Sequence, residues 1–272
     1  MRLVASDIDG TILGHDGKIS DRTVRAFHAC REAGVELVFV TGRPPRWLRP
    51  LHDRLGHTGT VICSNGAVVW DLEADRLVSA RALQLDAVFE ARRIIQRLRP
   101  SALFAAETLN GFHLEPGFIE NGSSELLAEV SPAPLHTTLA ATDSVVKFLA
   151  IVREGTADEF LAEVTPAVAH LAAATHSAPN IALLELSLPG VNKAVTLAEY
   201  AASLGVAADD VVAFGDMPND IEMLRWAGDG YAMASGHPEA ILAAGQQAPH
   251  FDDDGVAQIL EAKLAALGVR LP

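Results

Sequence analysis

Short apolar runs alternate with amphipathic stretches along the chain, and this pattern predicts its secondary structure. In the first part of the chain the apolar runs cover residues 3–6, 35–40 and 61–63, each of strand length. Between the first two runs, apolar positions recur at helical spacing over about residues 21–33, and Ser20 precedes them as an N-cap. Strands that alternate with helices in this way favour a parallel sheet covered by helices.

The pattern changes between residues 83 and 189. It predicts, in order, a helix over 86–98, paired strands within 104–115, a strand over 144–152, a helix over 157–170 and a strand over 181–188. Because the β–α repeat is absent here, we interpret this stretch as an inserted α/β module with an antiparallel sheet of its own.

After residue 190 the alternation of strands and helices returns. Helices are predicted over 193–204 and 256–267, and strands over 211–214 and 231–233. The predicted fold is therefore α/β, with a core domain made of residues 1–82 and 190–272. An inserted domain of residues 83–189 interrupts this core.

The first predicted strand ends in two carboxylates, Asp7 and Asp9, followed by Gly10 and Thr11. Along an extended chain, side chains two positions apart point the same way, so Asp7 and Asp9 are expected to face one cavity. Buried carboxylates are costly unless a metal ion or hydrogen bonds engage them. The local chemistry predicts a hard-cation site beside a carboxylate nucleophile.

Polar groups also follow the other predicted core strands, and the carboxyl ends of parallel strands meet at one edge of a sheet. They are Thr41, Gly42 and Arg43 after the second strand, Asn65 after the third, and Asp216, Asn219 and Asp220 after the strand over 211–214, with Lys193 at a helix start. An all-oxygen ligand set suits magnesium. Thr41, Lys193 and free backbone N–H groups suit a phosphoryl group.

Composition limits the partners and the cellular compartment. The 272 residues are 49% hydrophobic and carry a formal net charge of −14, which argues against nucleic acid or an anionic membrane as the partner. No apolar run reaches the ~18 residues of a membrane span. The first residues enter a strand directly, so we expect no signal peptide, and two cysteines give no disulfide framework. We expect a cytoplasmic protein, either monomer or homodimer, that acts on a small molecule.

Taken together, these motifs resemble the haloacid dehalogenase superfamily of hydrolases, in particular the Cof-type phosphatases of subfamily IIB. The matching motifs are Asp7-Ile8-Asp9-Gly10-Thr11, Thr41-Gly42-Arg43, Ser64-Asn65-Gly66-Ala67, Lys193, Gly215-Asp216-Met217-Pro218-Asn219-Asp220 and Asp254-Gly255-Val256. The resemblance covers the core at both ends of the chain. It implies a Rossmann-like core with a parallel sheet and a large α/β cap inserted after the third core strand.

The resemblance also implies a role for each matching residue. Asp7 would form an aspartyl-phosphate, and Asp9 would protonate the leaving group and then activate water. Thr41 and Lys193 would bind the phosphoryl group, while Gly42, Arg43 and Asn65 would shape the loops or reach the substrate. Mg²⁺ would be held by Asp7, the main-chain carbonyl of Asp9 and Asp216, with Asn219 and Asp220 as further ligands or neighbours.

Two departures from the family pattern and two alternative functions stay open at this point. The family usually has Lys-Gly where this chain has Lys193-Ala194, and the turn at Ala234-Ser235-Gly236-His237 is unusual. Neither departure removes a catalytic group. The main expectation is a Mg²⁺-dependent phosphatase for a small phosphorylated metabolite, such as a sugar phosphate. The alternatives are a hexose phosphomutase or another phosphotransferase, and a non-catalytic phosphate-binding regulatory protein.

Overall fold

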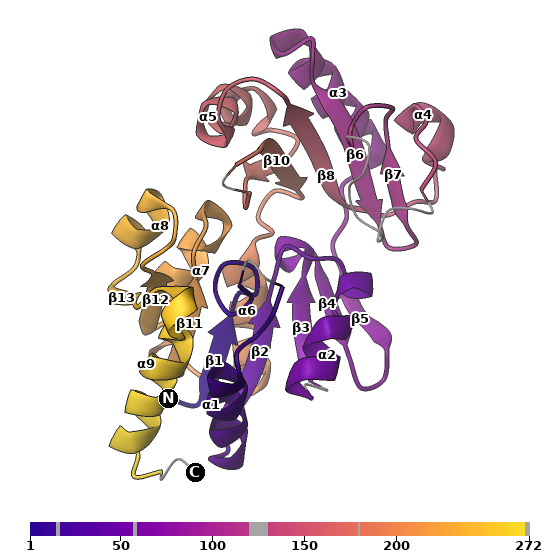
Figure 1. Ribbon diagram of the computed structural model, residues 1–272. Coiled ribbons are helices and arrows are strands. Elements are labelled where there is room, and N and C mark those ends of the chain that lie inside the picture. Colours follow the sequence, from indigo (N-terminus) through magenta and orange to yellow (C-terminus); the bar gives the residue numbers. More distant parts are fainter. Residues whose placement is uncertain (15–16, 57–58, 120–129, 179, 270–272) are drawn as a thin grey trace. The chain divides into compact units, whose positions relative to one another are not determined.

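The computed structural model describes residues 1–14, 17–56, 59–119, 130–178 and 180–269. The chain divides into two compact units, of which the first combines Met1–Ser79 with Asn192–Pro272. The second unit is a single stretch, Ala80–Val191. Two crossings of the chain therefore join an inserted unit to a core made of both ends of the sequence (Figure 1).

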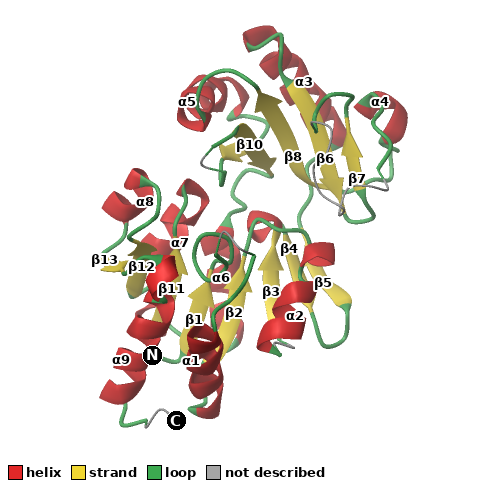
Figure 2. Cartoon of the chain, in the orientation of Figure 1, coloured by secondary structure: helices red, strands yellow, loops and turns green. Residues whose placement is uncertain are grey.

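The first unit is built on an eight-stranded sheet in the order β13-β12-β11-β1-β2-β3-β4-β5 (Figure 2). Its strands are β1 Leu3–Ser6, β2 Glu36–Val40, β3 Thr60–Cys63, β4 Val68–Asp71, β5 Arg76–Ala80, β11 Val211–Gly215, β12 Asp229–Met233 and β13 Gln246–Ala248. Neighbouring strands from β13 to β3 are parallel, and β4 returns antiparallel to β3. The carboxyl ends of the parallel strands thus share one edge, with β1 in the middle.

Helices cover both faces of this sheet, as a parallel sheet requires. They are α1 Asp21–Glu32, α2 Arg49–Leu55, α6 Lys193–Ser203, α7 Ile221–Trp226, α8 Pro238–Ala243 and α9 Gly255–Ala266. On one face Phe27 of α1 meets Phe39 of β2 edge to face, with ring centroids 5.4 Å apart. On the other face Leu197 of α6 packs in one cluster with Leu3 and Ala5 of β1.

The inserted unit has a five-stranded antiparallel sheet in the order β7-β6-β8-β10-β9. Its elements are α3 Leu85–Leu98, β6 Leu103–Thr108, β7 Phe112–Leu114, α4 Leu135–Thr138, β8 Val145–Val152, α5 Ala157–Val168, β9 Ala173–Thr175 and β10 Ala182–Ser187. Stacked rings of Phe104 and Phe148, 5.5 Å apart, share a core cluster with apolar side chains of α3 and α5. Both helices therefore cover one face of this sheet (Figure 1).

The predicted elements are confirmed with shifts of one or two residues at most ends, including the helix capped by Ser20, whose side chain accepts from Thr23 N. A small hairpin over 68–70 and 77–78, also suggested by the sequence, corresponds to β4 and β5, and two strands were missed, β9 and β13. Each has three residues, most of them not buried, so neither produces an apolar run in the sequence. Within the described ranges, no helix is long and apolar enough to cross a membrane.

Candidate active site

The segment that follows β1 places Asp7 and Asp9 in different environments. The Asp7 N–H donates to Phe214 O at 2.9 Å, which continues the β1–β11 pairing, and the Asp7 side chain is buried. After Asp7 the chain turns, because Ile8 O accepts from the N–H groups of three successive residues, 11–13. The Asp9 side chain, by contrast, is 54% exposed. After burial, the charges of Asp220 and Asp9 raise the pKa of Asp7, so the two carboxylates lie near each other, and their facing one cavity stays a prediction.

Lys193 is the buried cation of the site. It is the first residue of α6, whose N-cap Asn192 accepts from Val195 N. Lys193 Nζ donates to Asp7 Oδ1 at 2.6 Å and to Asp220 Oδ1 at 2.7 Å. Burial alone lowers the pKa of Lys193, but the carboxylates of Asp220 and Asp7 outweigh burial and raise it above its ordinary value. Lys193 is therefore a permanent positive charge at the end of β1.

Asp216 follows β11 and lies against the turn after β1. Thr11 Oγ1 donates to Asp216 Oδ1 at 3.2 Å. A Cβ on Gly10 would lie 2.3 Å from Asp216 Oδ2, and Gly10 has φ +77°, so only glycine fits between them. Burial, followed by the charges of Asp7 and Asp220, raises the pKa of Asp216 well above its usual range.

Asp220 accepts hydrogen bonds both from the loop after β11 and from Lys193. Its Oδ2 accepts from the backbone N–H groups of Asp216 and Met217 at 3.0 and 3.1 Å, and its Oδ1 accepts from Lys193. A Cβ on Gly215 would lie 2.5 Å from Asp220 Cβ, so this close approach requires glycine. Asp220 thereby orients both the backbone that carries Asp216 and the Lys193 ammonium.

The donor set fits a divalent cation. Oxygens of Asp7, Asp216 and Asp220 all lie within 4.8 Å of one another, and all three residues are buried. Three carboxylates share one lysine, so negative charge is in excess. Burial, despite the opposing Lys193, and the neighbouring carboxylates raise the pKa of Asp7 to about 7. Carboxylate oxygens are the ligands of Mg²⁺ in proteins, and a bound cation would favour the ionised forms.

The predicted phosphate loop after β2 contacts Asp9. Arg43 Nε and Nη2 donate to the two carboxylate oxygens of Asp9 at 2.7 and 2.6 Å, a bidentate pair. Thr41 is buried, and its Oγ1 accepts from the Arg43 N–H at 3.1 Å. Gly42 lies between them, so the Thr41-Gly42-Arg43 loop is bound to the turn that carries Asp9.

The two predicted asparagines pair with each other. Asn219 Nδ2 donates to Asn65 Oδ1 at 3.0 Å, and both residues are buried. Among the described residues, the buried Oδ1 of Asn219 has no hydrogen-bond partner. Of the predicted site residues, Asp7, Lys193, Asp216 and Asp220 thus form one network. Asn219 pairs with Asn65, and Arg43 pairs with Asp9 beside this network.

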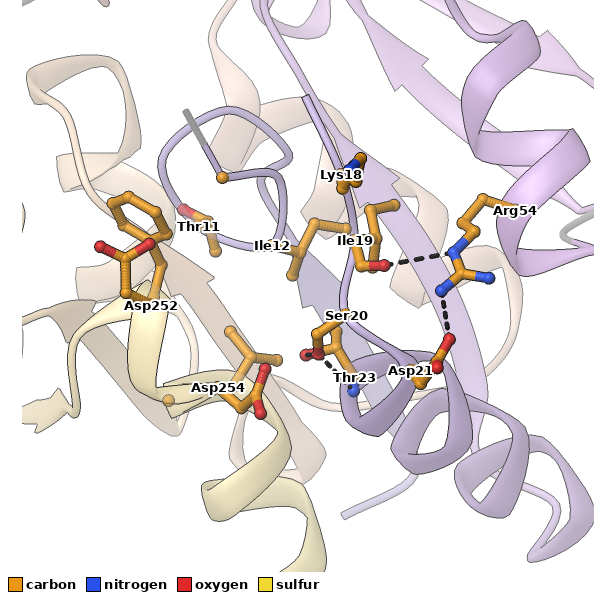
Figure 3. Close-up of a pocket in the computed structure, with 14 residues that line it drawn as sticks. Thr11, Ile12, Lys18, Ile19, Ser20, Asp21, Thr23, Arg54, Asp252 and Asp254 are labelled. Carbon is orange, nitrogen blue, oxygen red and sulfur yellow. Dashed lines mark hydrogen bonds and ion pairs between the residues drawn. The ribbon is translucent and has the colours of Figure 1, made fainter. Parts of the chain in front are cut away.

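A cavity of about 330 Å³ lies beside the turn after β1 (Figure 3). Ile12, Ser20, Asp21 and Asp254 are among the residues that line it, and Arg54 reaches Ile19 O and the Asp21 carboxylate at its wall. None of the predicted catalytic or metal residues lines this cavity. Thr11 links this cavity to the carboxylate cluster, since it lines the cavity and donates a hydrogen bond to Asp216. The sequence does not reveal this partner of Thr11, because a contact between residues 205 positions apart leaves no local pattern.

Comparison with known proteins identifies the family. Residues 4–260 match the family model of the haloacid dehalogenase-like hydrolases. The chain belongs to the haloacid dehalogenase-like hydrolases. The predicted resemblance to the Cof-type phosphatases is thereby confirmed, as is the predicted fold class of a core with an inserted α/β domain. This hydrolase is an enzyme of the phosphatase type.

Curated relatives of this hydrolase cover nearly its whole length. It is 30% identical over 243 residues to the HMP-PP phosphatase of Yersinia pseudotuberculosis, covering 88% of this chain and 85% of the relative. It is 27% identical over 262 residues to the 5-amino-6-(5-phospho-D-ribitylamino)uracil phosphatase YitU of Bacillus subtilis, covering 95% of this chain and 96% of the relative.

Solved structures share the fold of this hydrolase. SMU.1108c from Streptococcus mutans superposes with a TM-score of 0.83 at 24% identity, over 97% of this chain and 99% of that chain. The HAD subclass IIB sugar phosphatase BT4131 superposes with a TM-score of 0.79 at 20% identity, over 99% of this chain and 100% of that one. At these identities the likeness establishes the fold.

Proposed function

We propose that this hydrolase is a Mg²⁺-dependent phosphomonoesterase that cleaves small phosphorylated metabolites, such as sugar phosphates, through an aspartyl-phosphate on Asp7. The observation that carries the proposal is the position of Asp7, which contacts Lys193 and shares a buried cluster with Asp216 and Asp220. Asp7 is a buried carboxylate held beside the Lys193 ammonium, and the carboxylates around it exceed the positive charge. This arrangement suits attack of Asp7 on a phosphoryl group once a metal ion balances the negative charge.

In this proposal Asp7, Asp216 and the main-chain carbonyl of Asp9 hold Mg²⁺, with Asp220 and Asn219 as further ligands or neighbours. The ion supplies charge neutralisation that lets an anionic nucleophile approach an anionic phosphate. Both oxygens of Asp220 already accept hydrogen bonds, which favours the neighbouring role for that residue.

The chain's own groups carry the chemistry. A carboxylate oxygen of Asp7 forms a bond to phosphorus while the bond from phosphorus to the leaving oxygen breaks, and Asp9 gives its proton to that oxygen. Asp9 then takes a proton from water, whose oxygen attacks phosphorus and releases Asp7. Lys193 and the Thr41 hydroxyl bind the phosphoryl oxygens and offset the charge that develops on them.

Arg43 has to release Asp9 for this to happen, because the guanidinium engages both oxygens of that carboxylate. A phosphate presents the same bidentate geometry to arginine as a carboxylate does. We propose that Arg43, with Gly42 beside it, exchanges Asp9 for the substrate.

We propose that the inserted domain, residues 83–189, serves as the cap that selects the leaving group. The substrates named for the relatives, HMP-PP and 5-amino-6-(5-phospho-D-ribitylamino)uracil, support small phosphorylated metabolites as the class, and so does the likeness to the sugar phosphatase BT4131. The partner is then a small molecule and not nucleic acid or a membrane. We expect a cytoplasmic enzyme, monomeric or homodimeric, and the two buried free thiols suit that compartment.

The test is phosphate release from a panel of phosphorylated metabolites, with Mg²⁺ and with a chelator. We expect Mg²⁺-dependent release by the wild type and by Asp209→Asn, an exposed carboxylate before β11, and loss of release in Asp7→Asn. An Asp7→Asn variant with wild-type turnover would overturn the proposal. Transfer of phosphate to a sugar without steady release of inorganic phosphate would support the mutase instead.

A further inference from the structure

The turn after β3 adopts an unusual backbone conformation at the edge of the site. Ser64, Asn65 and Gly66 have φ values of +49°, +56° and +97°, so three successive residues lie in the left-handed region. Side chains other than glycine disfavour this region, and asparagine is among those that tolerate it best. Surrounding contacts must therefore hold the turn in place.

Contacts to the segment after β2 fix the turn from one side. The N–H of Asn65 donates to Thr41 O, and the N–H of Ser64 donates to Arg43 O, both at 3.0 Å. The turn thus sets the backbone of the loop that carries the proposed phosphate-binding hydroxyl of Thr41.

Contacts to α6 fix the turn from the other side. Thr196 Oγ1 donates to Gly66 O at 2.8 Å. A Cβ on Gly66 would lie 2.3 Å from Asn192 O, so the turn packs directly on the residue that precedes Lys193. The Asn65 side chain completes the arrangement by accepting from Asn219 Nδ2 at 3.0 Å.

We propose that Asn65 is a positioning residue of this site, a role separate from the predicted contact with substrate. Its left-handed backbone joins the Thr41 loop to the start of α6. Its side-chain oxygen fixes the amide of Asn219, whose buried Oδ1 has no partner within the described part of the chain. The expected loss of kcat rests on the proposed function, whereas the expected change in hydrogen exchange does not.

Two substitutions separate the backbone role from the side-chain role. Asn65→Gly keeps access to positive φ and removes only the amide, while Asn65→Ala removes the amide and strains the turn. The matched control is Ser64→Ala in the same turn, because the buried Ser64 Oγ has no partner among the described residues.

We expect kcat to fall about 10-fold to 100-fold in Asn65→Gly, with KM changed less. This is the size of effect seen when a residue that holds metal ligands in place is removed, about 10-fold to 100-fold. Asn65→Ala should lose more and should also melt at a lower temperature. Ser64→Ala should keep wild-type kcat. Since Asn65 acts through Asn219, adding Asn65→Gly to Asn219→Ala should change kcat by less than about two-fold.

Hydrogen exchange of the substrate-free enzyme gives the independent readout. Amides of residues 216–221 should exchange faster in Asn65→Gly than in the wild type, and at the wild-type rate in Ser64→Ala. The inference is overturned if hydrogen exchange of residues 216–221 is unchanged in Asn65→Gly. It is also overturned if the fold-decreases in kcat of Asn65→Gly and Asn219→Ala multiply in the double variant. A wild type that turns over no phosphoester would defeat the proposed function, and exchange would still decide the role of Asn65.

Discussion

Each unit of the molecule buries a lysine against carboxylates, and the two arrangements differ. In the inserted unit Lys147 of β8 pairs with Glu185 of β10 at 3.2 Å, and Ser177 Oγ donates to the other oxygen of Glu185 at 2.6 Å. In the core, Lys193 contacts Asp7 and Asp220 and lies beside Asp216, so that three carboxylates share the one ammonium.

The difference separates a structural pair from a reactive cluster. Lys147 contacts Glu185 on β10 and has the buried Glu107 as its register partner on β6, so the contacts of this lysine lie within one sheet. The core cluster joins groups from β1, α6 and the β11 loop, and its excess of carboxylates raises the pKa of Asp7 and of Asp216. Buried groups with strongly perturbed pKa values are characteristic of functional sites.

The largest expected effect comes from removing each lysine in turn. Lys193→Met should lower kcat by at least about 100-fold, as expected when a donor to the reacting phosphoryl group is lost. Lys147→Met should instead lower the free energy of unfolding by about 3 kcal/mol, since it leaves the buried Glu185 without its cation, while kcat on a small aryl phosphate stays near wild type. Steady-state kinetics and urea unfolding of both variants measure this. Equal kinetic losses in the two would remove the distinction.

The metal-free protein should lose stability as pH rises. The pKa of Asp7 is raised by burial from 3.8 to about 7, and that of Asp216 is raised as well, so the folded state binds more protons than the unfolded state between these values. The stability that these groups contribute is complete below pH ~4 and is lost through pH ~7. Urea unfolding with a chelator should show the decrease, and added Mg²⁺ should stabilise more at pH 8 than at pH 5. A Mg²⁺ effect independent of pH would contradict the cluster as the metal site.

Removing one carboxylate should relieve the same repulsion. Asp216→Asn keeps an oxygen that can accept from Thr11 and removes a charge facing Asp7 and Asp220, so the metal-free variant should melt about 2–4 °C higher at pH 8. It should also lose most of the Mg²⁺-dependent stabilisation. Scanning calorimetry with and without Mg²⁺ tests both points, with Asp209→Asn as the control. A lower melting temperature without metal would show that Asp216 stabilises the fold directly.

The smallest effect on stability is expected at the exposed pair of Arg43 and Asp9. Because the Asp9 side chain is 54% exposed, Arg43→Gln should change the free energy of unfolding by less than about 1 kcal/mol. Since Arg43 is proposed to exchange Asp9 for the substrate phosphate, Arg43→Gln should lower kcat/KM about 10-fold for alkyl phosphates and for p-nitrophenyl phosphate alike. A loss confined to alkyl phosphates, whose leaving group needs a proton, would mean that Arg43 acts through Asp9 instead.

The sequence by itself determined the fold class, most elements and the residue types of the site. Strand length, helical spacing and the cap at Ser20 are local signals, and strand β1 followed by Asp7 is visible in a window of a few residues. The parallel sheet follows from the β–α repeat, which brings the polar strand ends to one edge. These features depend on neighbours in the chain, so the pattern of residues was sufficient.

Only the tertiary structure decided which of these residues meet. Asp9 pairs with Arg43, and the backbone after β1 is a turn stabilised by hydrogen bonds to Ile8 O, not an extended strand. The contacts of Lys193 with Asp7, of Thr11 with Asp216 and of Asn219 with Asn65 span 186, 205 and 154 positions. Such contacts depend on strand order and loop conformation together. Burial then raises the pKa values of Asp7 and Asp216, and the sequence around either of them does not show this.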